Sequence, residues 1–295
     1  MHEGKHEPVG APFADGATAS AASGQPDPPL ASIIVTCKGR LHHLRRTLPS
    51  MLAQRCAFCY EVVVVDFGCP HGTFDWCRSL DVRNLVALKV LDYSDEFQLS
   101  RSRNCGASAA RGRLLAFVDA DMFLDATWLE TVVEVMRHGR IGLCTVVPDF
   151  RDGWDRAGSC IVSAAVFHAV RGYDEALRGW GSEDVDFCCR CAACTLAGKF
   201  APSLLTPIKH GHEERVRYQA DKDIGASNAR NAEYLRQRTG LVNPQGYGRG
   251  AFHIFRGSGE RLPPLTWVRR HRVVRPIRGG GPQGRQKELA ANIGP

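Results

Sequence analysis

The fold of this chain is decided by the stretch RLLAFVDADMFL, residues 113–124. The apolar run from Leu114 to Val118 predicts a buried strand, because strands of a parallel sheet are covered on both faces and read as continuous apolar sequence. The strand ends at Asp119 and Asp121, and open α/β sheets bind ligands outside the carboxyl ends of their strands. Two carboxylates there suit a hard divalent cation that takes oxygen ligands from protein and phosphate. On this motif alone, a surface turn that contains two acids explains the residues equally well.

Strands and helices alternate along most of the chain. Apolar runs predict further strands at 32–37, 61–66, 85–91 and 141–147. Apolar residues at helical spacing predict helices at 41–54 and 127–138. Further helices are expected at 100–110, which is rich in Ala and Arg, at 183–196, which opens with acidic residues, and at 224–238. This alternation indicates βαβ units with right-handed crossovers, so we expect an α/β fold with a mainly parallel central sheet flanked by helices. Thr36, Asp66 and the two aspartates follow three of the strands and should gather along one edge of the sheet, where a nucleotide would meet them.

The two ends of the chain differ from its centre. Residues 1–30 are rich in Gly, Ala, Pro and Ser without any period, which predicts disorder. One domain is expected at 31–240, with a nucleotide-binding half at 31–125 and a second half at 126–240. An irregular basic tail should follow at 241–295.

Composition and charge narrow the classes of function. The chain has 295 residues and a formal net charge of +7, with arginines concentrated around 269–278. It has no run of ~20 apolar residues and no secretory signal, which predicts a cytoplasmic location. A solvated basic tail is the simpler interpretation of the arginines, and peripheral contact with an anionic membrane surface is the functional alternative. We expect no nucleic-acid partner.

The twelve cysteines raise the question of a metal site. Cys56 and Cys59 are separated by two residues, as are Cys188 and Cys191, and then Cys191 and Cys194; this is a spacing typical of zinc sites. A structural zinc site needs four converging ligands, and zinc knuckles usually take them from a turn. Cys188, Cys191 and Cys194 can instead share one flank of a helix. Without an export signal, we expect most of the cysteines to be reduced thiols.

A loop at 179–182 precedes the helix predicted at 183–196. Glu183 and Asp184 open that helix, where acids interact favourably with the positive end of the dipole. This structural explanation leaves Trp180 unexplained, since it lies between two glycines just ahead of the acids. A large aromatic ring beside carboxylates suits the C–H face of a sugar ring, so the loop is a candidate sugar site.

These motifs, in their order between residues 32 and 240, resemble the GT-A glycosyltransferases of family 2, and most of all the bacterial chondroitin-polymerase type. The resemblance is carried by FQLSRSRNCGA at 97–107, LAFVDADM at 115–122 and GWGSEDVDF at 179–187. The second half is similar to the galactosyltransferase C-terminal region. The resemblance implies a Rossmann-like GT-A catalytic domain and metal-dependent, inverting transfer from a nucleotide-diphosphate sugar, a UDP-hexose or UDP-N-acetylhexosamine. The acceptor would be a hydroxyl of a glycan or another molecule.

The resemblance also implies which residues bind the metal and which contact the nucleotide-sugar donor. Asp121, His212 and Asp119 would form the metal site, and Asp119 would also face the ribose or the sugar. His210 competes for the metal, but the sequence His-Glu-Glu at 212–214 resembles the family's His-x-Glu and favours His212. The metal would be Mn²⁺ or Mg²⁺, and an imidazole ligand favours Mn²⁺. The donor contacts would fall on Thr36, Arg40, Asp66, Arg103 and Asn104.

Sugar transfer also needs a base, because the attacking hydroxyl loses its proton as it bonds to the anomeric carbon. A positioned carboxylate assists such a step by ~10²–10⁴-fold. The resemblance gives this role to Asp184 and gives Glu183 the task of holding the acceptor by hydrogen bonds. One base opposite the leaving group implies inversion. Trp180 and Gly181 would hold the acceptor and donor sugars.

Two other functions compete with this interpretation. A non-catalytic module on the same fold could bind carbohydrate or an anionic polymer, but it would be expected to have lost one of the four residues Asp119, Asp121, Asp184 and His212. A nucleotidyltransferase also uses metal-binding acids, with a Gly-rich basic loop after the first strand. The run Lys-Gly-Arg at 38–40 is a faint version of that loop, and it leaves the Trp-Gly-x-Glu-Asp motif unexplained. The sequence leaves the donor sugar, the acceptor and the oligomeric state open.

Overall fold

Four parallel strands form the centre of the protein, for which a computed structural model describes residues 28–147, 156, 158–219, 221–257 and 265–267. Their order is β3-β2-β1-β4. They are β1 (Ala31–Cys37), β2 (Tyr60–Asp66), β3 (Leu85–Val90) and β4 (Leu114–Asp119). The apolar runs that predicted strands are therefore strands, and they are almost entirely buried. The α/β fold with a mainly parallel centre is confirmed.

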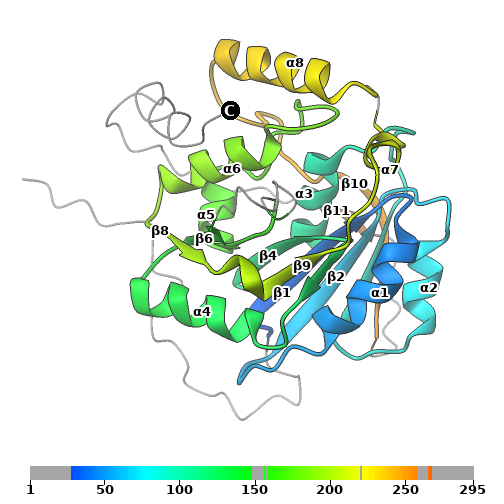
Figure 1. Ribbon diagram of the computed structural model, residues 1–295, viewed down its shortest axis with the longest axis vertical. Helices are drawn as coiled ribbons and strands as arrows, with labels where there is room; N and C mark the ends of the chain where they lie inside the picture. The colour runs from blue at the N-terminus through cyan, green and yellow to red at the C-terminus, as the bar shows by residue number, and fades with distance from the viewer. Residues whose placement is uncertain (1–27, 148–155, 157, 220, 258–264, 268–295) are drawn as a thin grey trace, which may run out of the picture.

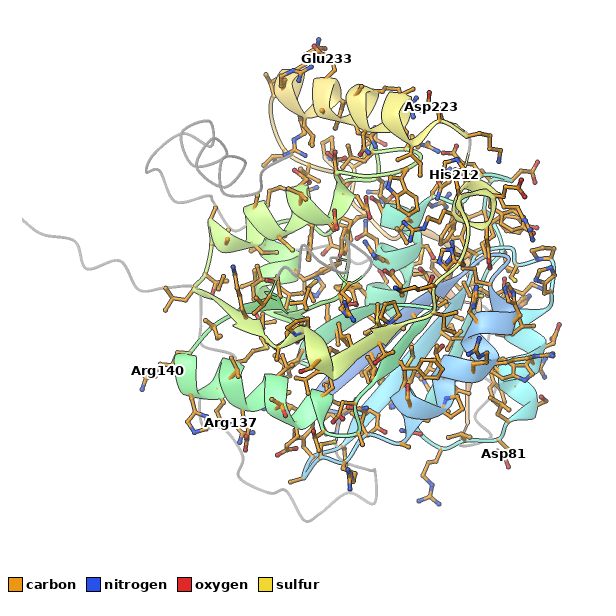
Figure 2. All side chains as sticks on the ribbon, in the orientation of Figure 1. Asp81, Arg137, Arg140, His212, Asp223 and Glu233 are labelled. Carbon is orange, nitrogen blue, oxygen red and sulfur yellow. The ribbon has the colours of Figure 1, made fainter. Side chains whose placement is uncertain are left out.

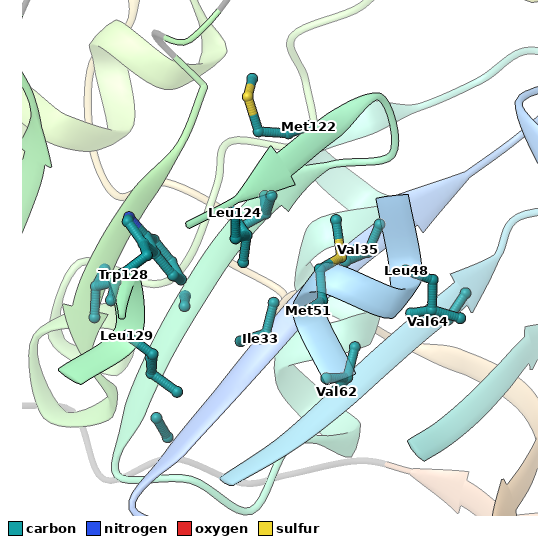
Figure 3. Close-up of a cluster of buried hydrophobic side chains, with 14 of the residues drawn as sticks. Ile33, Val35, Leu48, Met51, Val62, Val64, Met122, Leu124, Trp128 and Leu129 are labelled. Atoms are coloured by element: carbon teal, nitrogen blue, oxygen red, sulfur yellow. The ribbon is translucent and has the colours of Figure 1, made fainter. Parts of the chain in front are cut away.

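Helices cover both faces of this sheet (Figure 1). One face carries α1 (Leu41–Leu52), α2 (Thr73–Ser79) and α4 (Trp128–Gly139). The other face carries α3 (Leu99–Ala109), α5 (Ala164–Ala169) and α6 (Glu183–Ala192). Successive strand residues point to opposite faces, so Ile33 and Val35 pack in the first layer with Leu48 and Met51 of α1, whereas Ile34 packs in the second (Figure 3).

Further strands extend the sheet on both sides. In the described part of the chain it has nine strands, in the order β11-β10-β3-β2-β1-β4-β7-β6-β8. The additions are β6 (Leu143–Val146), β7 (Cys160–Ser163), β8 (Ala197–Phe200), β10 (Gly250–Arg256) and β11 (Leu265–Trp267). We predicted irregular structure throughout 241–295, but β10 pairs antiparallel with β3 and buries Phe252 and Ile254. The domain therefore continues to at least Arg256.

A second, two-stranded sheet connects the two halves of the chain. In this sheet β5 (Met122–Leu124) pairs antiparallel with β9 (Leu205–Pro207). The short 3₁₀ helix Pro202–Leu204 directly precedes β9. The chain then forms α7 (His212–Val216) and α8 (Ile224–Gln237). In Figure 1, α8 lies above α6, away from the sheet.

Several expectations concern residues outside the described part. Residues 1–27 of the segment predicted to be disordered belong there, as do the arginines at 269–278. Among the described helices, none is both long enough and apolar enough to cross a membrane.

Candidate active site

The carboxyl ends of β1, β2 and β4 lie side by side, as the sequence predicts. The strand register places Thr36 opposite Asp119, and Cys37 opposite Asp66. Thr36 and Asp66 are buried. Because the strands are parallel, their tips share one edge of the sheet, and residues of the second half of the chain meet them there.

Asp121 lies in a polar group with Arg40 and His210. The Nε2 atom of His210 is 2.7 Å from Oδ2 of Asp121, and Nη1 of Arg40 contacts that oxygen and also lies 2.6 Å from the same Nε2 atom. The pairing of β5 with β9 produces this arrangement. The N–H of Ile208 donates to the carbonyl oxygen of Asp121 at 2.7 Å, and the chain then presents His210 to the carboxylate. Only 8 % of the His210 side chain and 14 % of the Asp121 side chain are exposed.

His212 occupies a different place. It is the first residue of α7, and it is exposed. Figure 2 shows it on the α7 segment. No contact between described residues joins its ring to Asp121. The structure therefore brings His210, rather than the sequence-based choice His212, to the strand-tip aspartate.

The two aspartates after β4 differ in their electrostatics. Burial raises the pKa of Asp119, and the charge of Arg103 only partly offsets this effect. Burial also acts to raise the pKa of Asp121, but the hydrogen bond from His210 and the charge of Arg40 outweigh it, so the pKa is lowered. Asp121 therefore stays ionised, which is the form that a metal ligand requires.

Arg103 joins the strand tips to the second half of the chain. Its guanidinium is 3 % exposed, with Nη2 3.1 Å from Oδ1 of Asp119 and Nη1 3.3 Å from Oε1 of Glu183. The guanidinium carbon also lies 5.0 Å from the centre of the Tyr173 ring. A buried cation requires such partners, because removing it from water without them is costly. The contacts place α3, β4 and α6 around one polar cluster.

The first turn of α6 supplies two acids to this cluster. Burial raises the pKa of Glu183 to about 7, and the charge of Asp184 adds to the effect. Asp184 is half-buried, and its Oδ1 accepts the N–H of Val185 at 2.8 Å. Its Oδ2 has no hydrogen-bond partner among the described residues.

The loop before α6 is held by α8. Gly179, Gly181 and Ser182 have φ angles of 71°, 88° and 72°, a left-handed conformation in which glycine is unstrained. The N–H of Trp180 donates to Oγ of Ser227 at 2.7 Å. Nδ2 of Asn231 lies 2.9 Å from the carbonyl oxygen of Gly181 and 3.3 Å from that of Trp180.

Two residues predicted to contact the donor have their polar atoms engaged within the protein. The carboxylate of Asp66 accepts the N–H groups of Cys69 at 2.6 Å and Phe74 at 2.9 Å, which shapes the turn before α2. The amide of Asn104 is fully buried; it donates to the carbonyl oxygen of Tyr173 and accepts that residue's N–H, both at 2.9 Å. Asn104 thus connects α3 to the chain ahead of the Trp180 loop.

Lys38 and Tyr218 were not singled out from the sequence as site residues. Lys38 is buried just beyond the tip of β1, where its Nζ donates to the carbonyl oxygen of Phe67 at 3.3 Å. Nζ also lies 4.7 Å from the ring centre of Tyr93 and 6.0 Å from that of Tyr218. Gly39 has a φ of 73°, and a Cβ atom there would lie 1.8 Å from the Tyr218 ring. The Lys-Gly-Arg run after the first strand is the sequence pattern that could have pointed to Lys38. No local sequence pattern points to Tyr218.

The donor atoms present fit a divalent transition metal at Asp121 and His210. A carboxylate and an imidazole approach each other there at 2.7 Å, and this combination suits Mn²⁺ better than an all-oxygen site would. The cysteines offer no comparable group. In the described chain, the group of three or more metal-ligating side chains with converging atoms is His42, His43 and Glu214, and it contains no cysteine. All twelve cysteines are free thiols.

The sequence has a clear family assignment. Residues 32–197 match the model of the family described as Glycosyl transferase family 2. This match covers more than half of the chain, and the chain belongs to this family. The resemblance that the motifs indicated is confirmed.

Curated relatives match over part of the chain. The chondroitin synthase of Escherichia coli is 28 % identical over 106 residues, which are 36 % of this chain and 15 % of the relative. The validoxylamine A glucosyltransferase of Streptomyces hygroscopicus subsp. jinggangensis is 32 % identical over 107 residues, 36 % of this chain and 25 % of the relative. The matched regions thus span a quarter or less of these relatives.

Solved structures share the fold. S. aureus TarS in complex with UDP has a TM-score of 0.51 at 16 % identity, covering 70 % of each chain. The mannosyltransferase PcManGT from Pyrobaculum calidifontis, in complex with GDP-Man and Mn²⁺, has a TM-score of 0.53 at 16 % identity, covering 74 % of this chain and 67 % of that one. The fold is GT-A, as the resemblance implied.

Proposed function

We propose that this chain is a metal-dependent glycosyltransferase that transfers a sugar, with inversion, from a UDP-hexose or UDP-N-acetylhexosamine to a hydroxyl of a glycan or another acceptor. The contacts of Arg103 with Asp119 and with Glu183 are the main support for this proposal. They join the tip of β4 to the start of α6, which carries the residues assigned to the acceptor. The ligands named with two structural neighbours, UDP for TarS and GDP-Man with Mn²⁺ for PcManGT, agree with a nucleotide-sugar donor.

On the donor side, Asp121 and His210 would hold Mn²⁺ or Mg²⁺. The bound cation would act as a Lewis acid toward the diphosphate leaving group. Arg40 contacts both ligands and Arg103 contacts Asp119, so two guanidinium groups lie where negative charge develops as the sugar leaves. We assign these arginines to diphosphate binding.

On the acceptor side, Asp184 would take the proton from the attacking hydroxyl through Oδ2. Glu183 would orient the acceptor while Arg103 holds its carboxylate at 3.3 Å. Trp180 would supply the apolar surface for a sugar ring, with Gly181 allowing a close approach. One base on the acceptor side, opposite the leaving diphosphate, gives inversion at the anomeric carbon.

The remaining predicted residues would shape the nucleotide site. Thr36 and Asp119 face each other across the β1–β4 ladder and would border the uridine and ribose. Asp66 and Asn104 would act as positioning residues, because their polar atoms already bond to backbone groups of the protein.

The test is a panel of nucleotide sugars incubated with the full-length chain and Mn²⁺, with and without EDTA. We expect a UDP-sugar to be hydrolysed or transferred only when the cation is present, with an inverted anomeric configuration in the transfer product by NMR. Binding of donor without any turnover would favour the non-catalytic module, and conversion of the UDP-sugar to UTP and sugar 1-phosphate on addition of pyrophosphate would favour the nucleotidyltransferase. Either result would overturn the proposal.

A further inference from the structure

A cluster of His42, His43 and Glu214 lies beside the proposed active site and has no part in the mechanism above. Nε2 of His42 is 2.8 Å from Oε1 of Glu214, and Nε2 of His43 is 2.7 Å from the same oxygen. The ligand atoms of the three residues all lie within 4.8 Å of one another. Two imidazole nitrogens and one carboxylate oxygen thus converge on a small volume.

This convergence is unusual for neighbouring residues of a helix. Successive side chains of an α-helix diverge by roughly 100°, because the helix has about 3.6 residues per turn. Nevertheless the rings of His42 and His43, both in the first turn of α1, have centres only 4.1 Å apart. Both turn toward Glu214, which comes from α7 and is distant in sequence.

The cluster connects α7 to the proposed active site. Nη2 of Arg40 donates to the carbonyl oxygen of Glu214 at 3.3 Å, and the ring of His43 lies 5.4 Å from the ring of His210. Further along α7, the guanidinium carbon of Arg215 lies 5.9 Å from the ring centre of Trp180. Whatever holds Glu214 against α1 therefore also holds the chain that follows His210.

We propose that His42, His43 and Glu214 bind a zinc ion, at a site separate from Asp121 and His210, and that this ion fastens α7 to the start of α1. Two imidazoles and one carboxylate are a three-ligand zinc set that leaves a fourth position for water. Imidazole-rich sites favour zinc over Mg²⁺ or Mn²⁺. The His42 side chain is 55 % exposed, so the ion has access from solvent.

The binding test uses the tag-free, full-length chain, stripped of metal and titrated with Co²⁺ as a spectroscopic probe and then with Zn²⁺ as competitor. We expect visible absorption bands of a histidine–carboxylate Co²⁺ site, and their loss on addition of one equivalent of zinc. The bands should persist in Asp121→Asn, because that substitution alters the other site. They should disappear when His42→Ala or Glu214→Gln is added to the Asp121→Asn background, in which the other carboxylate–histidine site is disabled.

Glu213→Gln is the matched control, since Glu213 is the exposed neighbour of Glu214 on the same helix. Zinc stoichiometry in His42→Ala and Glu214→Gln equal to that of Glu213→Gln would overturn the site and leave an ordinary carboxylate–histidine contact. Circular dichroism checks that each variant is folded. Should Glu214→Gln fail to fold, His42→Ala decides the question, because its half-exposed side chain contributes little packing.

Proteolysis tests the fastening of α7 separately. Trypsin can cut after Arg215 and Arg217 within or next to α7. At free zinc about ten times the dissociation constant, cleavage through local opening should slow by about tenfold in the unaltered chain and in Glu213→Gln. It should not slow in Glu214→Gln. Zinc binding with unchanged cleavage in the unaltered chain would overturn this part of the proposal.

Discussion

The strand tips and the loop at 179–182 contribute to the same site but are held in different ways. Thr36 and Asp119 are positioned by the backbone ladder between β1 and β4, with neighbouring strands on both sides. The loop has left-handed residues and depends on side chains of α8, chiefly Ser227 and Asn231. A sheet edge gives charged groups a rigid arrangement, whereas a loop can change its side chains without disturbing the sheet. Substitutions at the strand tips, on the donor side, should therefore reduce activity more than substitutions in the loop.

The largest effect is expected on the donor side, from Asp121→Ala. The loss of the carboxylate beside His210 should cost several kcal/mol of stabilisation of the leaving group, which lowers transfer by about 10³-fold or more. Metal-dependent UDP binding should disappear in calorimetry. Asp125→Ala is the control, since Asp125 is exposed and its side chain forms hydrogen bonds only with Thr127 in the described chain. A variant at Asp121 that keeps most of its activity would contradict the assignment.

Asp184→Asn tests the acceptor side. We expect kcat to fall by about 10²–10⁴-fold, because the amide cannot accept the proton of the hydroxyl. The dissociation constant for UDP with Mn²⁺ should remain near that of the unaltered chain, since the oxygen that accepts the N–H of Val185 is retained. Substantial turnover in this variant would move the base to another residue.

Glu183→Gln tests the raised pKa of Glu183 through the pH dependence of folding stability. Burial raises the pKa of Glu183 from its ordinary 4.5 to about 7 in the folded protein, so the ionised form is disfavoured by folding. The unaltered chain should therefore lose stability relative to Glu183→Gln as the pH rises from 4.5 through 7, by at most about 3 kcal/mol. Below pH 4.5 the carboxyl is protonated in both states, and the difference should stay constant. Thermal unfolding between pH 4 and pH 8 measures this, and a pH-independent difference would contradict it.

His210→Ala and His212→Ala compare two histidines of one short segment. Removal of His210 should weaken Mn²⁺ binding by about 10–100-fold or more, since even groups behind the ligands have effects of this size. His212→Ala should leave Mn²⁺ affinity unchanged, because its side chain is exposed at the start of α7. The reverse result would restore the choice that the sequence favoured.

The smallest effect is expected from Asn231→Ala, which removes hydrogen bonds to the Trp180 loop. We expect the KM for acceptor to rise several-fold while UDP and Mn²⁺ binding stay unchanged, because the strand tips do not depend on α8. Glu233→Ala, on the exposed side of the same helix, is the control (Figure 2). A loss of UDP binding in Asn231→Ala would show that the two sides are not independent.

The centre of the fold could be predicted from the sequence because its signals are local. The runs at 32–37, 61–66 and 114–118 are continuous and apolar, and a parallel sheet follows from their alternation with helices. The strand β10, which lies between β11 and β3, was missed, although Phe252 and Ile254 alternate with more exposed residues. Its partner β3 lies far away in the sequence, and no local pattern predicts that pairing.

The site could be predicted only to the level of residue type and family motif. Asp119, Arg103 and Glu183 belong to motifs, and the structure brings them together. The choice between His210 and His212 depends on the register of β5 with β9, each only three residues long. Strands this short give little periodic signal, so a residue's place relative to Asp121 could not be read from the sequence.

The β5–β9 pairing also has a consequence for the order of assembly. It joins Met122 to Pro207 across a long intervening segment. Closing so long a loop costs chain entropy before its contacts are gained, and the β1–β4 pairing has a similar cost because it joins Thr36 to Asp119. The two pairings differ instead in when their residues are synthesised, since β1 to β4 all precede Met122. During synthesis on the ribosome the central sheet can form first, and the histidine reaches its aspartate only after the second half has emerged. The proposed cation site can therefore form only after β9 and His210 have been synthesised.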